Sequence, residues 1–416
     1  MTGVYEALLS QLGLPEKAVL TGGDDDWHSA PIERVGIPRL KVTDGPVGAR
    51  GESYVSATSA LFPCASALGA TFDTDLVSRV GAAIGDEVRT KGAHVLLGPT
   101  LNLHRHPQGG RNFESYGEDP MHVARTGAAF IRGVQGRGVG ACAKHLVAND
   151  AEIERLTISS EVDETTLREV YLLPFEAAVK DAGVWTVMGA YNRLNGTYAC
   201  EHHWLLTQLL KGEWGFDGLV MSDWHAAHDT VRCAHAGLDL EMPGPAAQLG
   251  GRVADAVRQG AVSEASLTDA ARRLLRTLDR VEATLDESPE RSDDDPQRWA
   301  LARDAAAAAM VLLRNEPVNG APLLPLDPMA LRRVAVVGPN AEIAVVQGGG
   351  SARVAPHRTA SPVEGLRTRL GDGVEIVVEQ GAVRSRQLPV LDGRLAHHDG
   401  RGGVRVEYRS RGREPV

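Results

Sequence analysis

The chain has 416 residues, of which 43% are hydrophobic and 24% charged, as in soluble globular proteins long enough for two domains. Its formal net charge of −10 argues against a nucleic-acid binder, which needs a basic face. The sequence contains no run of 18 apolar residues and no secretory signal, so we expect no membrane span and a cytoplasmic location.

Short apolar runs alternate with longer amphipathic stretches between about residues 30 and 285. The candidate strands are Arg39–Thr43, His94–Thr100, Val139–Lys144, Val184–Ala190, Gly218–Ser222 and Leu238–Met242. The candidate helices are Asp75–Lys91, His122–Gly136, Glu164–Asp181 with a kink at Pro174, His203–Trp214, and one run from Val253 to Glu282. This alternation predicts a TIM-like (β/α)8 barrel over residues 1–285, and six strands instead of eight predict an irregular one.

The rest of the chain is predicted to form a linker and two incomplete domains. Residues 286–297 are charged and aperiodic, as linkers are. Residues 298–385 begin with an alanine-rich helix, Arg298–Arg314, and continue through the strand-like RRVAVVG into a partial α/β sandwich. In residues 386–416, VRVEY alternates like a strand but no sheet follows it, so we expect the truncated start of a further domain.

Four cysteines, at positions 64, 142, 200 and 233, follow no metal-binding spacing. We expect buried thiols in a reducing compartment. The pairs His225–His228 and His104–His106 have no third ligand at a suitable spacing, so the sequence predicts neither a metal nor a cofactor.

Polar residues follow several of the predicted strands at their downstream ends. Asp44, Lys144, His145, Tyr191 and Asp223 all occupy such positions. Because the carboxyl ends of barrel strands open into one mouth, these side chains are expected to form a single polar site.

The segments that carry these residues occur in a specific order. They are KVTDGPVGARG (41–51), FPCASALGATFD (62–73), GGRNFESYGEDP (109–120), AKHLVAND (143–150), LREVYLLPFEAAVKDAG (167–183), VMGAYNRLNG (187–196) and MSDWHAAHD (221–229). Over about residues 30 to 370 the chain resembles glycoside hydrolase family 3 of the β-glucosidase type. The resemblance implies a barrel followed by an α/β sandwich, with the active site between them.

Asp223, in the SDW motif, matches the nucleophile of that family. A retaining glycosidase needs an ionised carboxylate to attack the anomeric carbon, and Arg111 and Lys144 could hold Asp223 in that state. The competing interpretation is that Asp223 caps a helix beginning at Trp224–His225.

The resemblance also implies the residues that bind the terminal sugar. Asp44, Arg111, Lys144, His145 and Tyr191 match positions that hold its hydroxyls. Met188 and Trp224 would offer apolar surface to its C–H face, and Arg50 is a weaker candidate. Structural interpretations remain open: Asp44-Gly-Pro is a turn signal, Lys144–His145 could be a buried pair, and Met188 could be ordinary core.

The general acid is not assigned by these motifs. The resemblance implies a glutamate from the second domain or beyond, and GGGSARV (348–354) resembles a sandwich-domain loop that approaches the active site. In relatives with an inserted carbohydrate-binding domain related to protective antigen, sequence resembling VVEQGAV (377–383) and LDGRLAHHDGRGGVRVEY (391–408) precedes the insert. We therefore expect the acid to lie beyond Val416. KHLVAND lacks the histidine of the loop from which β-N-acetylglucosaminidases draw their acid.

The sequence therefore predicts a retaining, exo-acting β-glucosidase of carbohydrate metabolism, which forms a glycosyl–Asp223 intermediate on small glycosides. Two alternatives remain open. One is a β-xylosidase or arabinosidase on the same frame, and the other is a glycan-binding fragment with little activity. We expect no nucleic-acid or membrane partner, and a homo-oligomer is possible.

Overall fold

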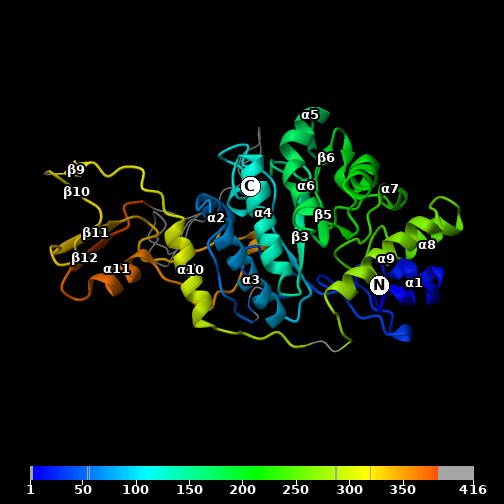
Figure 1. The fold of residues 1–416 in the computed structure, drawn as a ribbon, viewed down its shortest axis with the longest axis horizontal. Coiled ribbons are helices and arrows are strands. Elements are labelled where there is room, and N and C mark those ends of the chain that lie inside the picture. The colour runs from blue at the N-terminus through cyan, green and yellow to red at the C-terminus, as the bar shows by residue number, and fades with distance from the viewer. Residues whose placement is uncertain (1–2, 54, 56, 286–287, 319, 383–416) are drawn as a thin grey trace, which may run out of the picture. The chain divides into compact units, whose positions relative to one another are not determined.

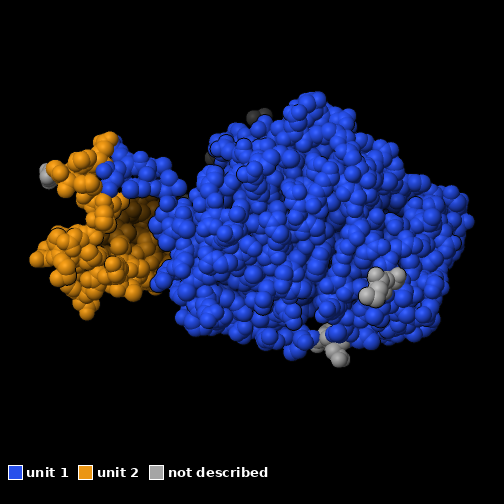
Figure 2. All heavy atoms as spheres, viewed as in Figure 1, with its two compact units in different colours: residues 1–315, 346–359 blue, residues 316–345, 360–416 orange. Residues whose placement is uncertain are grey.

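The computed structural model describes residues 3–53, 55, 57–285, 288–318 and 320–382, and divides the chain into two compact units (Figure 2). Unit 1 consists of residues 1–315 and 346–359, and unit 2 of residues 316–345 and 360–416. The helix predicted at 298–314 and the loop GGGSARV thus lie in unit 1, although the sequence placed them in the second domain. The expected domain at 386–416 lies outside the described residues.

Five parallel strands form the centre of unit 1 in the order β1-β2-β3-β5-β8. Their bounds are Val42–Asp44, Val95–Leu97, Gly140–Leu146, Thr186–Gly189 and Leu219–Ser222. Every residue of these strands is buried, as expected where helices cover a parallel sheet. Alternate residues face different cores: Val95, Cys142 and Met188 pack in one apolar cluster, whereas Leu96, Ala141 and Val187 pack in another.

The sixth predicted strand, Leu238–Met242, is reduced to isolated bridges that close the ring. Leu240 pairs with Met221 of β8, and Glu241 pairs with Gly22. Gly23 then pairs with Ser29, and His28 pairs with Lys41 immediately before β1. The last two pairings are antiparallel, so the closed ring is an irregular barrel, as the sequence predicted.

Helices cover the outside of this ring (Figure 1). The longer ones are α3 (Thr74–Thr90), α4 (Pro120–Gln135), α9 (Glu264–Arg280) and α10 (Pro296–Ala308), and the shorter are α1 (Leu14–Val19), α2 (Ala65–Ala70), α5 (Glu164–Thr166), α6 (Leu173–Lys180), α7 (Thr230–Ala236) and α8 (Gly251–Arg258). Asp73 and Asp119 accept backbone N–H groups at the starts of α3 and α4. These helices are therefore defined by local caps as well as by their apolar faces.

Four predicted helices differ from the observed ones. The predicted helix His203–Trp214 is π-helical over Trp204–Glu213. The run Val253–Glu282 is two helices, because Gly260 adopts a φ of 72° and Ser263 caps the start of α9. The predicted helix Arg298–Arg314 ends at Ala308. Before Pro174, a π-helical segment, Leu167–Tyr171, replaces regular α-helix.

Unit 2 contains two parallel strands, β11 (Arg333–Val337) and β12 (Glu375–Glu379), with α11 (Pro362–Leu370) between them in sequence. The first strand is the one predicted in RRVAVVG. A short hairpin joins β9 (Pro317–Val318) to β10 (Ala321–Pro322), and unit 1 has a small sheet of β4 (Ser159–Ser160), β6 (Arg193–Leu194) and β7 (Thr197–Tyr198). Within the described residues, no helix combines the length and apolarity that a membrane crossing requires.

Candidate active site

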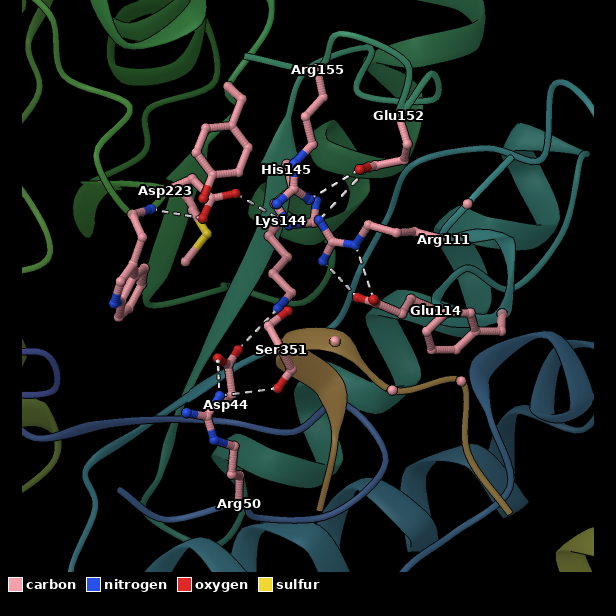
Figure 3. Close-up of a pocket in the computed structure, with 18 of the residues that line it drawn as sticks. Asp44, Arg50, Arg111, Glu114, Lys144, His145, Glu152, Arg155, Asp223 and Ser351 are labelled. Carbon is pink, nitrogen blue, oxygen red and sulfur yellow. Dashed lines mark hydrogen bonds and ion pairs between the residues drawn. The ribbon is translucent and has the colours of Figure 1, made fainter. Parts of the chain in front are cut away.

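A cavity of about 490 Å³ opens at the carboxyl ends of the parallel strands (Figure 3). All nine residues singled out from the sequence line it: Asp44, Arg50, Arg111, Lys144, His145, Met188, Tyr191, Asp223 and Trp224. They come from strand ends and loops that are far apart in sequence, which is how barrel folds build a site. The volume suits a small ligand such as one sugar ring with part of its substituent.

Asp223 follows β8 and is buried at the cavity wall. Its Oδ1 accepts the backbone N–H of Trp224 at 2.8 Å, and its carboxylate also accepts the Tyr191 hydroxyl. No helix starts there: His225 has a φ of 65°, and α7 begins only at Thr230 under the cap of Asp229. The alternative interpretation of Asp223 as the cap of a helix at Trp224–His225 is therefore wrong.

The charge state of Asp223 reflects two opposing effects. Burial raises the pKa of the Asp223 carboxyl above its usual range, and the charges of Arg111 and Lys144 oppose that rise. Burial, and then the charge of the same carboxylate, raise the pKa of Tyr191, so this phenol stays protonated and acts as a donor. The two cations named from the sequence are thus the ones that favour the ionised carboxylate.

His145, in β3, lies beside Asp223. Burial, reinforced by Arg111 and Lys144, lowers the pKa of His145 well below its usual value, so the ring is neutral. Its Nδ1 lies 3.0 Å from Oδ1 of Asn102, an oxygen that also accepts the backbone N–H of His145. With Nδ1 donating, Nε2 is left as an acceptor 3.6 Å from Oδ2 of Asp223. A ligand hydroxyl can donate to it.

Asp44 occupies another part of the cavity wall, at the end of β1. Its Oδ1 lies 3.4 Å from Nζ of Lys144, and its Oδ2 lies 3.3 Å from Nη1 of Arg50. Burial raises the pKa of the Asp44 carboxyl, and Lys144 and Arg50 oppose the rise. These long contacts leave oxygen lone pairs and N–H groups directed at the cavity, where vicinal hydroxyls could exchange hydrogen bonds with both.

Several pocket residues were missed by the sequence analysis. Glu114 accepts two hydrogen bonds from Arg111, at 2.9 Å and 2.7 Å, which fix the plane of that guanidinium. Burial alone would raise the pKa of Glu114, but the hydrogen bonds and charge of Arg111 outweigh it and lower the pKa. The three-residue spacing of the pair within GGRNFESYGEDP was a usable signal for it.

Glu152 and Arg155 were also missed, because their role depends on a loop that follows β3. Arg155 donates to Glu152 at 3.0 Å, and its guanidinium lies 4.8 Å from the centre of the Tyr191 ring. Trp27 completes an aromatic wall: its ring centre lies 5.6 Å from that of Trp224. Trp27 stands in the acidic stretch GGDDDWHS, which carries no apolar periodicity.

The loop Gly348–Ser351 forms a further wall, as its resemblance to an active-site loop implied. Gly348 packs so closely on the ring of Phe113 that a Cβ there would lie 2.6 Å from it. The carbonyl of Ser351 accepts a hydrogen bond from Arg50 at 3.4 Å (Figure 3). The loop belongs to unit 1, so the whole cavity is built within one unit.

Two family models match the chain. Residues 28–277 match the glycosyl hydrolase family 3 N-terminal domain, and residues 310–403 match the family 3 C-terminal domain. A β-glucosidase of Rhizobium radiobacter is 48% identical over 406 residues, which cover 96% of this chain and 49% of that protein. β-Glucosidase B of Emericella nidulans is 42% identical over 97% of this chain and 48% of its own length.

Solved structures agree with these matches. A β-glucosidase of Kluyveromyces marxianus in complex with glucose has a TM-score of 0.86 and 35% identity, covering 99% of this chain and 51% of that one. β-Glucosidase 3B of Thermotoga neapolitana in complex with glucose has a TM-score of 0.81 and 35% identity, covering 89% and 54%. The chain therefore spans about half the length of the relatives it matches.

Proposed function

Since this chain belongs to glycosyl hydrolase family 3, we propose that it acts as a β-glucosidase, which releases terminal β-linked glucose with retention of configuration. The observation that carries the proposal is the position of Asp223: a buried carboxylate at a cavity wall, attended by two cations and a phenol donor. Relatives named β-glucosidase and glucose-bound structures of the same fold support glucose as the sugar.

In the proposed mechanism, Asp223 attacks C1 of the sugar and the C1–O bond to the aglycone breaks. Tyr191 holds one carboxylate oxygen by its hydroxyl, and Arg111 favours the ionised form. Water then cleaves the glycosyl ester, which restores the original configuration at C1. The double displacement requires the nucleophile to be ionised before attack.

The sugar hydroxyls are proposed to bind to Asp44, Lys144, Arg111 and His145. Asp44 and the Nε2 atom of His145 accept, whereas Lys144 and Arg111 donate. Trp224 and Met188 offer apolar surface to the C–H face of the ring, and Arg50 acts through Asp44. A polar rim over one apolar wall is the arrangement that recognises a pyranose.

The departing oxygen needs a proton from a carboxylic acid. Glu114 does not suit this role, because its hydrogen bonds to Arg111 favour the ionised carboxylate, and the carboxylate of Glu152 is engaged by a hydrogen bond from Arg155. We propose that a glutamate outside the described residues donates this proton. Tests of this chain should therefore use a leaving group acidic enough to depart unprotonated.

The deciding experiment is to incubate the chain with 2,4-dinitrophenyl 2-deoxy-2-fluoro-β-D-glucoside and to map the label by mass spectrometry. The 2-fluoro group slows both formation and hydrolysis of the ester, and the dinitrophenyl leaving group keeps formation fast, so the intermediate accumulates. We expect one fluoroglucosyl group on the peptide that contains Asp223, and none on Asp223→Asn.

Asp229→Asn is the matched control, because Asp229 caps α7 a few residues away and does not line the cavity. This variant should be labelled like the wild type. Label on another residue would overturn the assignment of the nucleophile, and preferential turnover of the corresponding xyloside would replace glucose as the sugar.

A further inference from the structure

A buried carboxylate outside the cavity joins several chain segments. Glu87, on α3, is fully buried. It accepts hydrogen bonds from the Ser59 hydroxyl at 2.8 Å and from Arg298 of α10 at 2.8 Å, and Nε2 of His357 lies 3.6 Å away. Lys91 lies one turn further along α3, 4.0 Å from the carboxylate. Such a cluster is held rigidly, because breaking one pair strands a charge without water.

The Ser59 contact anchors the first of two segments that reach the cavity. Ser59 belongs to the loop after β1, and this loop also carries the cavity residue Arg50. The loop is folded back on itself by a hydrogen bond from the backbone N–H of Phe62 to the carbonyl of Val47. Fixing Ser59 therefore restricts where the Arg50 end of the loop can lie.

The second segment, residues 346–359, is anchored through Ser59 and Thr58, because Nε2 of His357 lies 3.6 Å from Glu87 and makes no hydrogen bond to it. Its backbone pairs with Ser59: Ser59 donates to Ala355 at 2.9 Å, and His357 donates to Ser59 at 2.9 Å. Nδ1 of His357 also lies 2.7 Å from the Thr58 hydroxyl. Both segments are thus held to each other and to Glu87 at one end.

The cavity end of the second segment is shaped by its own clamp. The side-chain amide of Gln347 donates to the carbonyl of Val354 at 2.8 Å and accepts its N–H at 2.8 Å. This closes a loop whose tip, Gly348–Ser351, lines the cavity. At that tip, Ser351 accepts from Arg50, which also contacts Asp44 (Figure 3).

From this chain of contacts, which runs from Glu87 through both segments to Arg50, we propose that Glu87 is a positioning residue for the sugar site. The Glu87 carboxylate holds Ser59, whose backbone pairs with Ala355 and His357 of the second segment. The opposite ends of both segments meet at Arg50, the neighbour of Asp44. Loss of the Glu87 charge should loosen the wall around Asp44 without touching Asp223. The inference rests on the proposed function in taking glucose as the ligand.

The test compares Glu87→Gln with wild type in steady-state hydrolysis of 2,4-dinitrophenyl β-D-glucoside and in competitive inhibition by glucose. We expect KM and the glucose inhibition constant both to rise about tenfold, because small displacements of binding groups are costly, while kcat changes by less than about threefold. Hydrogen–deuterium exchange should quicken in residues 57–62 and 346–359 but not in β3 and β5. A purely structural role would leave KM unchanged.

The matched control is Asp86→Asn, at the adjacent position of α3, whose carboxylate pairs with Arg137 at the surface at 2.7 Å. Its kinetic constants should equal those of wild type. If Glu87→Gln does not fold, Ser59→Ala, which removes a single hydrogen bond from the carboxylate, carries the same test with a smaller expected rise in KM.

A folded Glu87→Gln or Ser59→Ala variant with KM within about twofold of wild type overturns the inference. Failure of the proposed function looks different: wild-type protein neither turns over the glucoside nor becomes labelled at Asp223. In that case the exchange measurement still decides whether Glu87 holds the two segments.

Discussion

Two of the buried charge clusters described in unit 1, one around Asp44 and Asp223 and one around Glu87, differ in what surrounds them. Around Asp44 the charged partners lie 3.3 and 3.4 Å away, and Asp223 accepts a 2.8 Å hydrogen bond from a backbone N–H, but both carboxylates lie beside an open cavity. Around Glu87 the carboxylate takes two hydrogen bonds of 2.8 Å and is fully buried. The carboxylates of Asp44 and Asp223 can therefore also hydrogen-bond to a ligand in the cavity. The carboxylate of Glu87 hydrogen-bonds only within the protein.

The comparison teaches that a buried charge is not in itself a sign of catalysis. Both clusters combine carboxylates with Lys, Arg and His, and both join elements distant in sequence. What separates them is access to a cavity. Substitutions in the first cluster should therefore act on kinetics, and substitutions in the second chiefly on stability and on positioning.

The largest expected effect comes from Asp223→Asn. An amide cannot form the glycosyl ester, so kcat on 2,4-dinitrophenyl β-D-glucoside should fall by about a thousandfold or more, while circular dichroism and glucose binding persist. Activity within about tenfold of wild type would show that Asp223 is not the nucleophile, and that the cluster beside the cavity is not the catalytic one.

A smaller effect, but a sharper contrast, is expected from Asp44→Asn. Loss of charge-assisted hydrogen bonds to the sugar should lower kcat/KM by about 10- to 100-fold. Because Asp44 borders the cavity, water can solvate Lys144 and Arg50 in the variant, and the free energy of unfolding should change by less than about 1 kcal/mol.

Glu87→Gln should show the opposite balance. Removing a fully buried charge leaves Arg298 paired with Asp293 alone and Lys91 with two backbone carbonyls, and should lower the free energy of unfolding by about 3–5 kcal/mol. Urea denaturation of the two variants in parallel measures the difference. Equal losses of stability would mean that the cavity does not distinguish the clusters.

The smallest effect is expected from Tyr191→Phe and concerns pH. The ionised form of Asp223 attacks, so activity disappears as pH falls through its pKa. Burial raises that pKa, and the Tyr191 hydroxyl is among the groups that lower it. Removing the hydroxyl should raise the pKa further and move the acid limb of kcat/KM to higher pH by up to about one unit.

The pH profile should be measured on the dinitrophenyl glucoside, whose departure needs no protonation. A limb that stays in place, or moves to lower pH, would show that Tyr191 does not stabilise the carboxylate. The same profile of Asp229→Asn provides the baseline, since Asp229 caps α7 away from the cavity.

Sequence alone located the barrel and the cavity residues well, for physical reasons. Strands buried on both faces appear as short apolar runs, and a polar residue directly after such a run, such as Asp44 or Asp223, must lie at the strand's carboxyl end. Position along the chain therefore determined position in space for these residues. Their roles in binding and catalysis remain predictions.

The features that sequence missed are those decided by partners. The segment from Gly22 to Ser29 helps to close the ring through single bridges. Its acidic sequence shows no alternation typical of a strand. Glu152 and Arg155 were missed because their place in the site depends on contacts with Arg111 and Tyr191, which lie far from them in sequence. The break between α8 and α9 depends on Gly260, which has a positive φ. Apolar periodicity does not reveal such a backbone conformation.

The isolated bridges of the ring have a consequence for how the barrel opens. At Gly22–Glu241 and His28–Lys41 the wall is held by single pairings, whereas β3 and β5 share a longer ladder. Unfolding should begin at this seam. The backbone amide hydrogens of Gly23 and Glu241 should therefore exchange with solvent earliest. Because Trp27 and the start of β1 flank the seam, partial opening would dismantle the aromatic wall before the carboxylate of Asp223 is disturbed.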